Sequence, residues 1–173
     1  SLPPLDLVAL LNEIFSRFDR LVEEFGLEKI KTIGDAYMVV SGLPLTRSDH
    51  ASAALELAIA MRREISRLRQ HTGLPLEIRI GLNSGSVVAG VIGLKKFSYD
   101  LWGDAVNLAS RMESQGIPGK IQVTAATFVR LQRQYQFERW ANLMVKGKGR
   151  MTTYLYIRRL PKTKNALALS LIH

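Results

Sequence analysis

The stretch KIKTIGDAYMVVS, residues 29–41, predicts two β-strands joined by a tight turn. Residues that favour strands lie on both sides of Gly34 and Asp35, and a Gly-Asp pair between such runs is a common hairpin turn. Lys31 and Asp35 place a cation and a carboxylate four positions apart around this turn. A hairpin of this kind needs no ligand, but its tip can also offer charge to a phosphorylated purine and its metal ion.

Two amphipathic helices are predicted on either side of this hairpin. Apolar residues recur from Leu5 to Phe25 at the spacing of a helix that buries one face, and Gly26 ends the pattern. A second pattern of the same period follows Ser48 or Asp49, either of which can cap a helix, and continues to about residue 73.

The second half of the chain predicts more strands and two shorter helices. Leu76–Leu82 alternates apolar and polar residues, and Val87–Ile92 is predicted as its hairpin partner. Two hairpins separated by a helix indicate helices packed on one side of a largely antiparallel sheet. The remaining predicted elements are a helix from Asp104 to near Gly116, a strand Lys120–Val123, a helix capped by Thr124, and strands near Phe137–Trp140 and Thr153–Arg158.

The composition is that of an ordinary globular domain. The chain has 173 residues, of which 47% are hydrophobic and 23% charged, which is enough to bury a core without cross-links. It contains no cysteine, so a disulfide framework and a thiolate metal site are both excluded. No apolar run approaches the roughly 20 residues that cross a bilayer. We therefore expect no membrane segment in these residues and a cytoplasmic location, either free or as the cytosolic domain of a membrane-anchored protein.

The formal net charge of +9 first suggests a nucleic-acid partner. The arginines, however, are spread over the face of a predicted helix that also carries Glu56 and Glu64, and no aromatic residues alternate with them. This distribution is typical of a solvated face, so we expect no nucleic-acid binding. A basic surface would still attract a polyanionic nucleotide at long range.

Two further polar segments accompany the hairpin: YDLWGDAVNLASRME at residues 99–113 and VKGKG at residues 145–149. Together the three segments resemble the catalytic domain of class III nucleotidyl cyclases, the adenylate and guanylate cyclases, from about Leu7 to about Tyr156. The resemblance implies an α+β fold with a ferredoxin-like, palm-type antiparallel sheet. It also implies a catalytic domain over residues 1–160, followed by a C-terminal tail over residues 161–173.

In this family two aspartates hold two divalent cations, Mg²⁺ or Mn²⁺, and Asp35 matches the second of them. The first aspartate normally follows an opening strand, and these residues contain no counterpart of that strand or its loop. Asp6 is no substitute, because it lies in a helical pattern where it favours the helix dipole. We expect that an upstream stretch of the natural protein is absent here, that regulatory domains precede it, and that this chain alone binds metal poorly.

Asn107 and Arg111 lie four residues apart on one face of a predicted helix, so both side chains can reach the same cleft. By resemblance they are the catalytic pair that orients the ribose and stabilises the charged phosphorus. The alternative is a capped surface helix in which Arg111 pairs with Glu113 or Asp104.

Lys31 and Asp100 correspond, by the same resemblance, to the two positions that select the base. A lysine donates to N1 of adenine and an aspartate accepts from its N6 amine, an order that guanine reverses. The pair predicts ATP as the substrate, although each residue alone is also typical of an exposed strand or a turn. Lys146 is predicted to contact the triphosphate, with Lys148 as its substitute; the alternative is a Gly-Lys-Gly turn without a ligand.

These residues indicate an adenylate cyclase catalytic domain that converts ATP to cyclic AMP and pyrophosphate. Lys31 and Asp35 share one hairpin, yet base and metal lie at opposite ends of a nucleotide that spans roughly 10 Å. The resemblance resolves this with a homodimer, in which one subunit supplies the metal aspartates and the other supplies the remaining site residues. Two alternatives stay open: a guanylate cyclase that uses GTP, and a non-catalytic module that dimerises or senses nucleotide.

Overall fold

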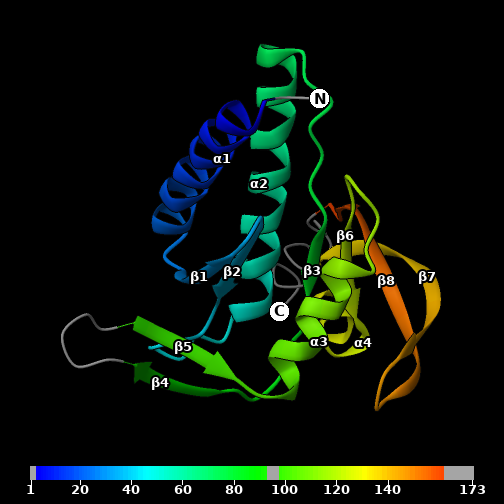
Figure 1. The fold of residues 1–173 in the computed structure, drawn as a ribbon. Coiled ribbons are helices and arrows are strands. Elements are labelled where there is room, and N and C mark those ends of the chain that lie inside the picture. Colours follow the sequence, from blue (N-terminus) through cyan, green and yellow to red (C-terminus); the bar gives the residue numbers. More distant parts are fainter. Residues whose placement is uncertain (1–2, 93–97, 162–173) are drawn as a thin grey trace, which may run out of the picture.

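A computed structural model of the protein describes residues 3–92 and 98–161 (Figure 1). Within these ranges four helices and eight strands alternate as an α+β domain, as predicted. In order along the chain they are α1 (Pro4–Glu24), β1 (Glu28–Ile33), β2 (Ala36–Val40), α2 (His50–Thr72), β3 (Ile80–Leu82), β4 (Val88–Ile92), β5 (Ser98–Trp102), α3 (Asp104–Ser114), β6 (Ile121–Thr124), α4 (Ala125–Leu131), β7 (Tyr135–Val145) and β8 (Gly149–Arg159).

The described strands divide into one mixed sheet and two separate hairpins. The four-stranded sheet has the order β3-β6-β8-β7, in which β3 and β6 are parallel and the other neighbours antiparallel. Strands β1 and β2 pair with each other, and so do β4 and β5. In Figure 1 the β4–β5 hairpin projects away from the four-stranded sheet, and the β1–β2 hairpin lies beside α1 and α2. The hairpins therefore carry their residues outside the main sheet.

The predicted pairing of Leu76–Leu82 with Val87–Ile92 is wrong. Strand β3 covers only the last three residues of the first range and pairs with β6, whereas β4 pairs with β5. The residue after β3 explains the difference. The Asn83 side chain donates to the carbonyl of Ala105 (3.0 Å) and accepts from the hydroxyl of Thr124 (2.7 Å). These bonds hold the chain to α3 and β6 where a hairpin would have to turn back.

Helix α2 is buried on two sides and organises the core. Leu55, the most buried residue of the helix, packs with residues of β6 and β8, whereas Leu57 on another side packs with α1. The two resulting clusters are centred on Leu55, Ala58, Ile59, Ile121, Val123 and Tyr156, and on Phe18, Val22, Leu27, Leu57, Met61 and Ile65. Gly73 then ends the helix in the left-handed conformation, with a φ of 71°.

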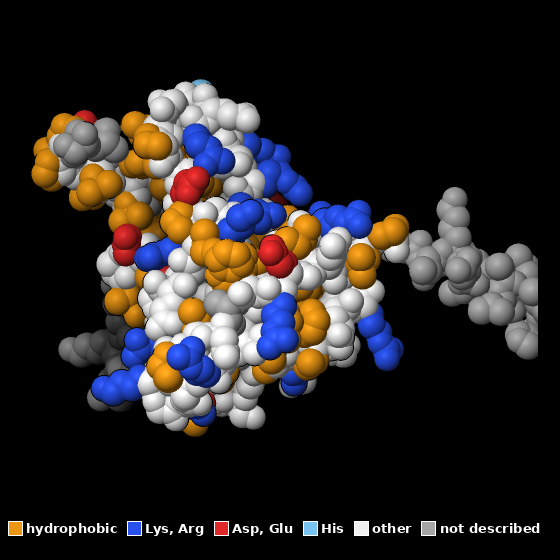
Figure 2. All heavy atoms as spheres, turned by 90° about the vertical axis from the view of Figure 1, so that its right-hand side faces the viewer, with side chains coloured by type: hydrophobic (Ala, Val, Ile, Leu, Met, Phe, Trp, Pro, Cys, Tyr) orange, Lys and Arg blue, Asp and Glu red, His pale blue; other side chains and the backbone are white. Residues whose placement is uncertain are grey.

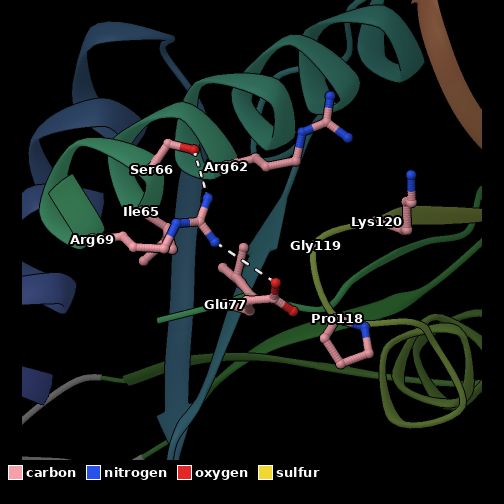
Figure 3. A pocket seen from close by; sticks show the side chains of 9 residues that line it. Arg62, Ile65, Ser66, Arg69, Glu77, Pro118, Gly119 and Lys120 are labelled. Atoms are coloured by element: carbon pink, nitrogen blue, oxygen red, sulfur yellow. Dashed lines mark hydrogen bonds and ion pairs between the residues drawn. The ribbon is translucent and has the colours of Figure 1, made fainter. Parts of the chain in front are cut away.

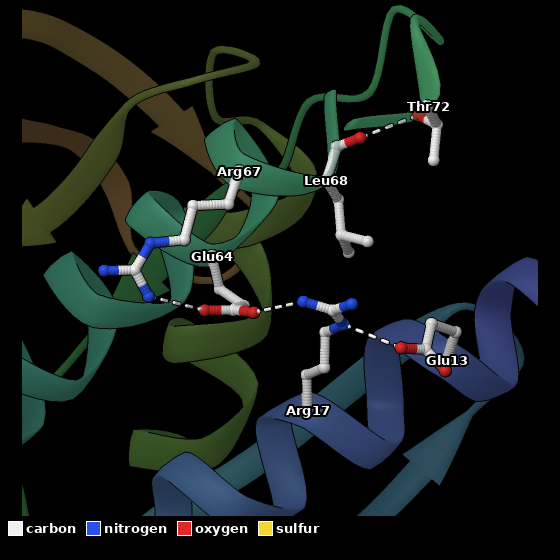
Figure 4. Close-up of polar contacts among 6 residues, drawn as sticks. All are labelled: Glu13, Arg17, Glu64, Arg67, Leu68 and Thr72. Carbon is white, nitrogen blue, oxygen red and sulfur yellow. Dashed lines mark hydrogen bonds and ion pairs between the residues drawn. The ribbon is translucent and has the colours of Figure 1, made fainter. Parts of the chain in front are cut away.

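An ion-pair chain joins α1 to α2 beside the second cluster (Figure 4). The Arg17 guanidinium donates to Glu13 (2.8 Å) and to Glu64 (2.6 Å), and Arg67 donates to the other oxygen of Glu64 (3.2 Å). The Glu64 side chain is only 13% exposed, so its carboxylate depends on these two partners more than a surface group would. These ion pairs link α1 to α2 in addition to the apolar contacts of the second cluster.

The outer surface carries scattered charge. On the face shown in Figure 2, Lys and Arg side chains are spread among hydrophobic and neutral ones. No helix in residues 3–92 and 98–161 combines the length and apolar character that crossing a bilayer requires.

Replacing Glu56 by glutamine should make the free energy of unfolding less sensitive to pH in the acid range. Glu56 of α2 accepts from Arg159 (2.9 Å) and Tyr135 (3.0 Å), which lie on β8 and β7. The Arg159 bond lowers the pKa of Glu56; burial opposes this and the Tyr135 bond supports it, so that the pKa lies below its ordinary 4.5. A lowered folded-state pKa stabilises the fold above the unfolded-state pKa, and this contribution disappears as pH falls through the folded-state pKa.

We expect Glu56→Gln to lower the free energy of unfolding by about 1 kcal/mol near neutral pH and by much less near about pH 3. Urea unfolding at both pH values measures this difference. The control is Glu138→Gln, which changes an exposed residue of β7. An equal loss at the two pH values would contradict the assignment.

Candidate active site

Lys31 and Asp100 meet, although they lie 69 positions apart in the chain. The Lys31 ammonium donates to Oδ2 of Asp100 at 2.7 Å, and the backbone N–H of Leu101 donates to Oδ1 at 2.8 Å. The Asp100 side chain is 14% exposed and that of Lys31 43%. The Lys31 bond, followed by the Leu101 bond, holds the pKa of Asp100 below its ordinary value. The structure thus places the two predicted base-selecting residues side by side, one on β1 and one on β5.

Asn107 and Arg111 both lie exposed on α3, one turn apart. Within the described residues neither side chain has a hydrogen-bond or ion-pair partner. The partners that the alternative reading assigned to Arg111 are engaged elsewhere: Glu113 pairs with Arg79 (3.5 Å) and Asp104 with Lys148 (2.6 Å). The two side chains are therefore available to a ligand.

The position of α3 depends on residues that the sequence analysis did not single out as functional. Gly81 of β3 lies directly under the helix: a Cβ placed there would be 2.1 Å from the backbone nitrogen of Glu113. Gln122 of β6, 1% exposed, donates from its side chain to the carbonyl of Met112 (3.0 Å) and accepts from Thr153 (3.0 Å). In the sequence, Gly81 and Gln122 stand out only because each lies between two apolar residues of a predicted strand.

Lys146 and Asp35 both lie exposed at hairpin turns. Lys146 follows β7 and, within residues 3–92 and 98–161, its side chain has no polar partner. Its predicted substitute, Lys148, instead forms an ion pair with Asp104, the first residue of α3. This pair brings the β7–β8 turn to the end of the helix that carries Asn107.

The donor set does not complete a metal site. The described residues contain no group of three or more His, Asp or Glu side chains arranged to hold an ion. Asp35 is an exposed carboxylate at the β1–β2 turn, and Mg²⁺ bound by proteins usually takes one or two carboxylates together with substrate phosphates.

A surface hollow of about 370 Å³ lies elsewhere, between α2 and the loop before β6 (Figure 3). Figure 3 shows Arg69 bonded to Ser66 and facing Glu77, with Lys120 across the hollow. It contains none of the predicted site residues. Those residues lie instead on β1, the β1–β2 turn, β5, α3 and the β7–β8 turn.

The family model for the adenylate and guanylate cyclase catalytic domain matches residues 1–158. The chain belongs to this family. It is 47% identical over 159 residues to an adenylate cyclase of Mycobacterium tuberculosis, covering 92% of this chain and 36% of the relative. It is 41% identical over 166 residues to the guanylate cyclase soluble subunit beta-2 of Rattus norvegicus, covering 95% of this chain and 24% of that protein. The chain thus spans about a third or less of the length of these curated relatives.

Solved cyclase domains share the fold. The adenylyl cyclase CyaB from P. aeruginosa matches with a TM-score of 0.84 at 30% identity, covering 95% of this chain and 87% of that one. The guanylate cyclase domain of RhGC from Catenaria anguillulae, in complex with GTP, matches with a TM-score of 0.84 at 38% identity, covering 92% and 87%. These likenesses confirm the predicted α+β, palm-type fold of this cyclase domain.

Proposed function

We propose that this cyclase domain, residues 1–160, is an adenylate cyclase that converts ATP to 3′,5′-cyclic AMP and pyrophosphate. The observation that carries the proposal is the contact between Lys31 and Asp100. A donor and an acceptor 2.7 Å apart can each bind one of two neighbouring groups on a base edge. Adenine presents an acceptor at N1 beside a donor at N6, which fits this order, whereas guanine presents the reverse.

The reaction forms one bond and breaks one. The ribose 3′ hydroxyl gives its proton to water and its oxygen attacks the α-phosphorus, and the bond from that phosphorus to the bridging oxygen breaks as pyrophosphate leaves. Arg111, with a planar guanidinium and no partner within the described residues, is suited to hold the charge that develops on the phosphoryl oxygens. Asn107, one turn away, would orient the ribose, and Lys146 would contact the triphosphate and offset part of its charge.

Divalent cations would supply charge neutralisation at the phosphates and activation of the attacking oxygen. We propose Asp35 as a carboxylate that would hold the two Mg²⁺ or Mn²⁺ ions. The roles given above to Arg111, Asn107 and Lys146 do not depend on these ions.

A homodimer would complete the site. Lys31 and Asp35 lie four residues apart on one hairpin. We propose, from the resemblance to cyclase domains, that Lys31 contacts the base of one nucleotide while Asp35 serves the phosphate end of the other, so that each contributes to a different site of a symmetric pair. We further propose a cytoplasmic setting, where ATP is available, and joined regulatory domains, since the curated relatives are about three times as long or longer.

Reversing the charge of Lys31 should remove most of the preference for adenine. Lys31→Glu replaces the donor to adenine N1 with an acceptor, which suits guanine N1–H, and it places two carboxylates together. We expect kcat/KM for ATP to fall about a hundredfold relative to that for GTP. Steady-state assays of cyclic AMP and cyclic GMP formation, with Mn²⁺ and each nucleotide in turn, measure the ratio.

The matched control is Lys120→Glu, the same charge change at an exposed lysine beside the hollow of Figure 3. Its ratio should equal that of the unaltered protein. A guanylate cyclase is the second candidate, because guanylate cyclases are among the relatives, and it would show preference for GTP before any substitution. Cyclic product from neither nucleotide would favour a non-catalytic module.

A further inference from the structure

We propose that Asp19, Lys29 and Tyr37 form a clamp between α1 and the β1–β2 hairpin that positions Lys31 for base selection. We call these three residues the hairpin clamp. The inference rests on the proposed function, in which Lys31 selects adenine. It assigns positioning roles to three residues that lie outside the site itself.

Three contacts define the clamp. The Tyr37 hydroxyl donates to Oδ1 of Asp19 at 2.5 Å, and the Lys29 ammonium lies 3.0 Å from the same oxygen. The ammonium also lies 5.1 Å from the centroid of the Tyr37 ring, within cation–π range. One carboxylate of α1 therefore binds both strands of the hairpin at once.

The environment favours this arrangement. The Tyr37 ring packs against Phe15 at a centroid distance of 5.4 Å and edge-on against Phe18 at 5.5 Å. Burial, followed by the bond to Asp19, raises the pKa of the Tyr37 hydroxyl well above its ordinary value. Burial raises the pKa of Asp19, but the bonds from Tyr37 and Lys29 outweigh it and leave that pKa lowered. The hydroxyl remains a donor and the carboxylate an acceptor throughout the neutral range.

A β-bulge separates the two lysines of β1. Lys29 lies opposite Val39 and Lys31 lies opposite Met38, so Ile30 is an extra residue on β1. Opposite residues of an antiparallel pair share a face, and consecutive residues point to opposite faces. Lys29 and Lys31 therefore face opposite sides of the hairpin, whereas a regular strand would place both on the same side.

Because of the bulge, the hairpin is bonded to the clamp on one side and to the site on the other. On one side Lys29 is bonded to α1 through Asp19, and on the other Lys31 is bonded to Asp100 of β5. Any rotation of the hairpin about its length that breaks the first contact also moves the second. The clamp is half exposed, with the Asp19 side chain 50% and that of Lys29 37% accessible, so its loss should change geometry more than stability.

Two conservative variants test the clamp. Tyr37→Phe removes the hydroxyl but keeps the ring against Phe15 and Phe18, and Asp19→Asn removes the charge but keeps the shape. We expect each to lower the ratio of kcat/KM for ATP over GTP by about fivefold. The matched control is Arg17→Gln, which breaks the ion pair of α1 with α2 and leaves the hairpin contacts intact. Its ratio should not change, although it should lose stability.

A second measurement does not depend on turnover. In a carbon-detected NMR titration of the domain, the pKa of Asp100 should rise towards its ordinary value in both clamp variants, because Lys31 moves away, and should stay low in Arg17→Gln. An Asp100 pKa unchanged in all three variants would overturn the clamp. If the unaltered protein forms no cyclic nucleotide but the Asp100 pKa responds as described, the clamp stands and the proposed function fails.

Discussion

Replacing Arg111 by alanine should lower kcat for cyclic AMP formation by about a hundredfold to a thousandfold. Arg111 lies exposed on α3 and, within the described residues, its guanidinium has no partner, so the substitution removes no contact of the folded chain. The free energy of unfolding should stay within about 0.5 kcal/mol of the original. Steady-state kinetics and urea unfolding of the same preparation measure both quantities.

Two further variants show whether the effect is specific to the Arg111 guanidinium. Arg111→Lys keeps the charge but loses the two-pronged geometry of the guanidinium, so it should recover only part of the rate. Arg130→Ala removes an arginine of α4 that bonds to its own helix, at the carbonyl of Ala126, and should leave kcat unchanged. If Arg111→Ala kept more than half of the original kcat, Arg111 would have no role at the phosphate.

The Arg111→Ala variant also tests whether each site is built from residues of two subunits. If Asp35 and Arg111 of one subunit serve different sites, mixing Asp35→Ala with Arg111→Ala creates dimers in which one site carries both changes and the other carries neither. When equal amounts of the two variants exchange subunits, the mixture should regain about a quarter of the original activity. Activity that does not exceed the sum of the two separate variants would contradict a site shared between protomers.

Replacing Gly81 by alanine should displace α3 and impair both stability and turnover. The new Cβ would lie 2.1 Å from the nitrogen of Glu113 and 2.4 Å from the carbonyl carbon of Met112. Both are backbone atoms, so no side-chain rotation can relieve the clash and the helix itself must move. We expect a loss of about 3 kcal/mol in the free energy of unfolding, at the upper end for overpacking. Activity should fall as well, because Asn107 and Arg111 move with the helix.

Gly73→Ala provides the control for Gly81. Gly73 follows the last residue of α2; a Cβ there would meet nothing within 4 Å, and the only cost is its left-handed backbone, with a φ of 71°. We expect a loss of about 1 kcal/mol and unchanged kcat. Calorimetry and kinetics separate the two variants. Equal losses in both would mean that close packing of β3 under α3 is not what holds the helix in place.

The local elements of the fold were predictable because each has a local cause. The period of apolar residues in α1 and α2 and the Gly34-Asp35 turn depend on neighbours within a few positions. The α+β arrangement followed from the order of these elements. The pairing of β4 was not predictable in this way, because Asn83 turns the chain away from a hairpin through bonds to Ala105 and Thr124, which come later in the sequence.

The sequence by itself determined which residue types are available to the site: Lys31 within a strand, Asp35 and Lys146 at turns, and Asn107 with Arg111 one helical turn apart. Only the tertiary structure decided which of them meet and what holds them. The contact of Lys31 with Asp100, the bulge at Ile30 and the seating of α3 on Gly81 each join distant segments or break a regular period. A periodic pattern records which face of one element is buried, but it does not record which surface covers that face.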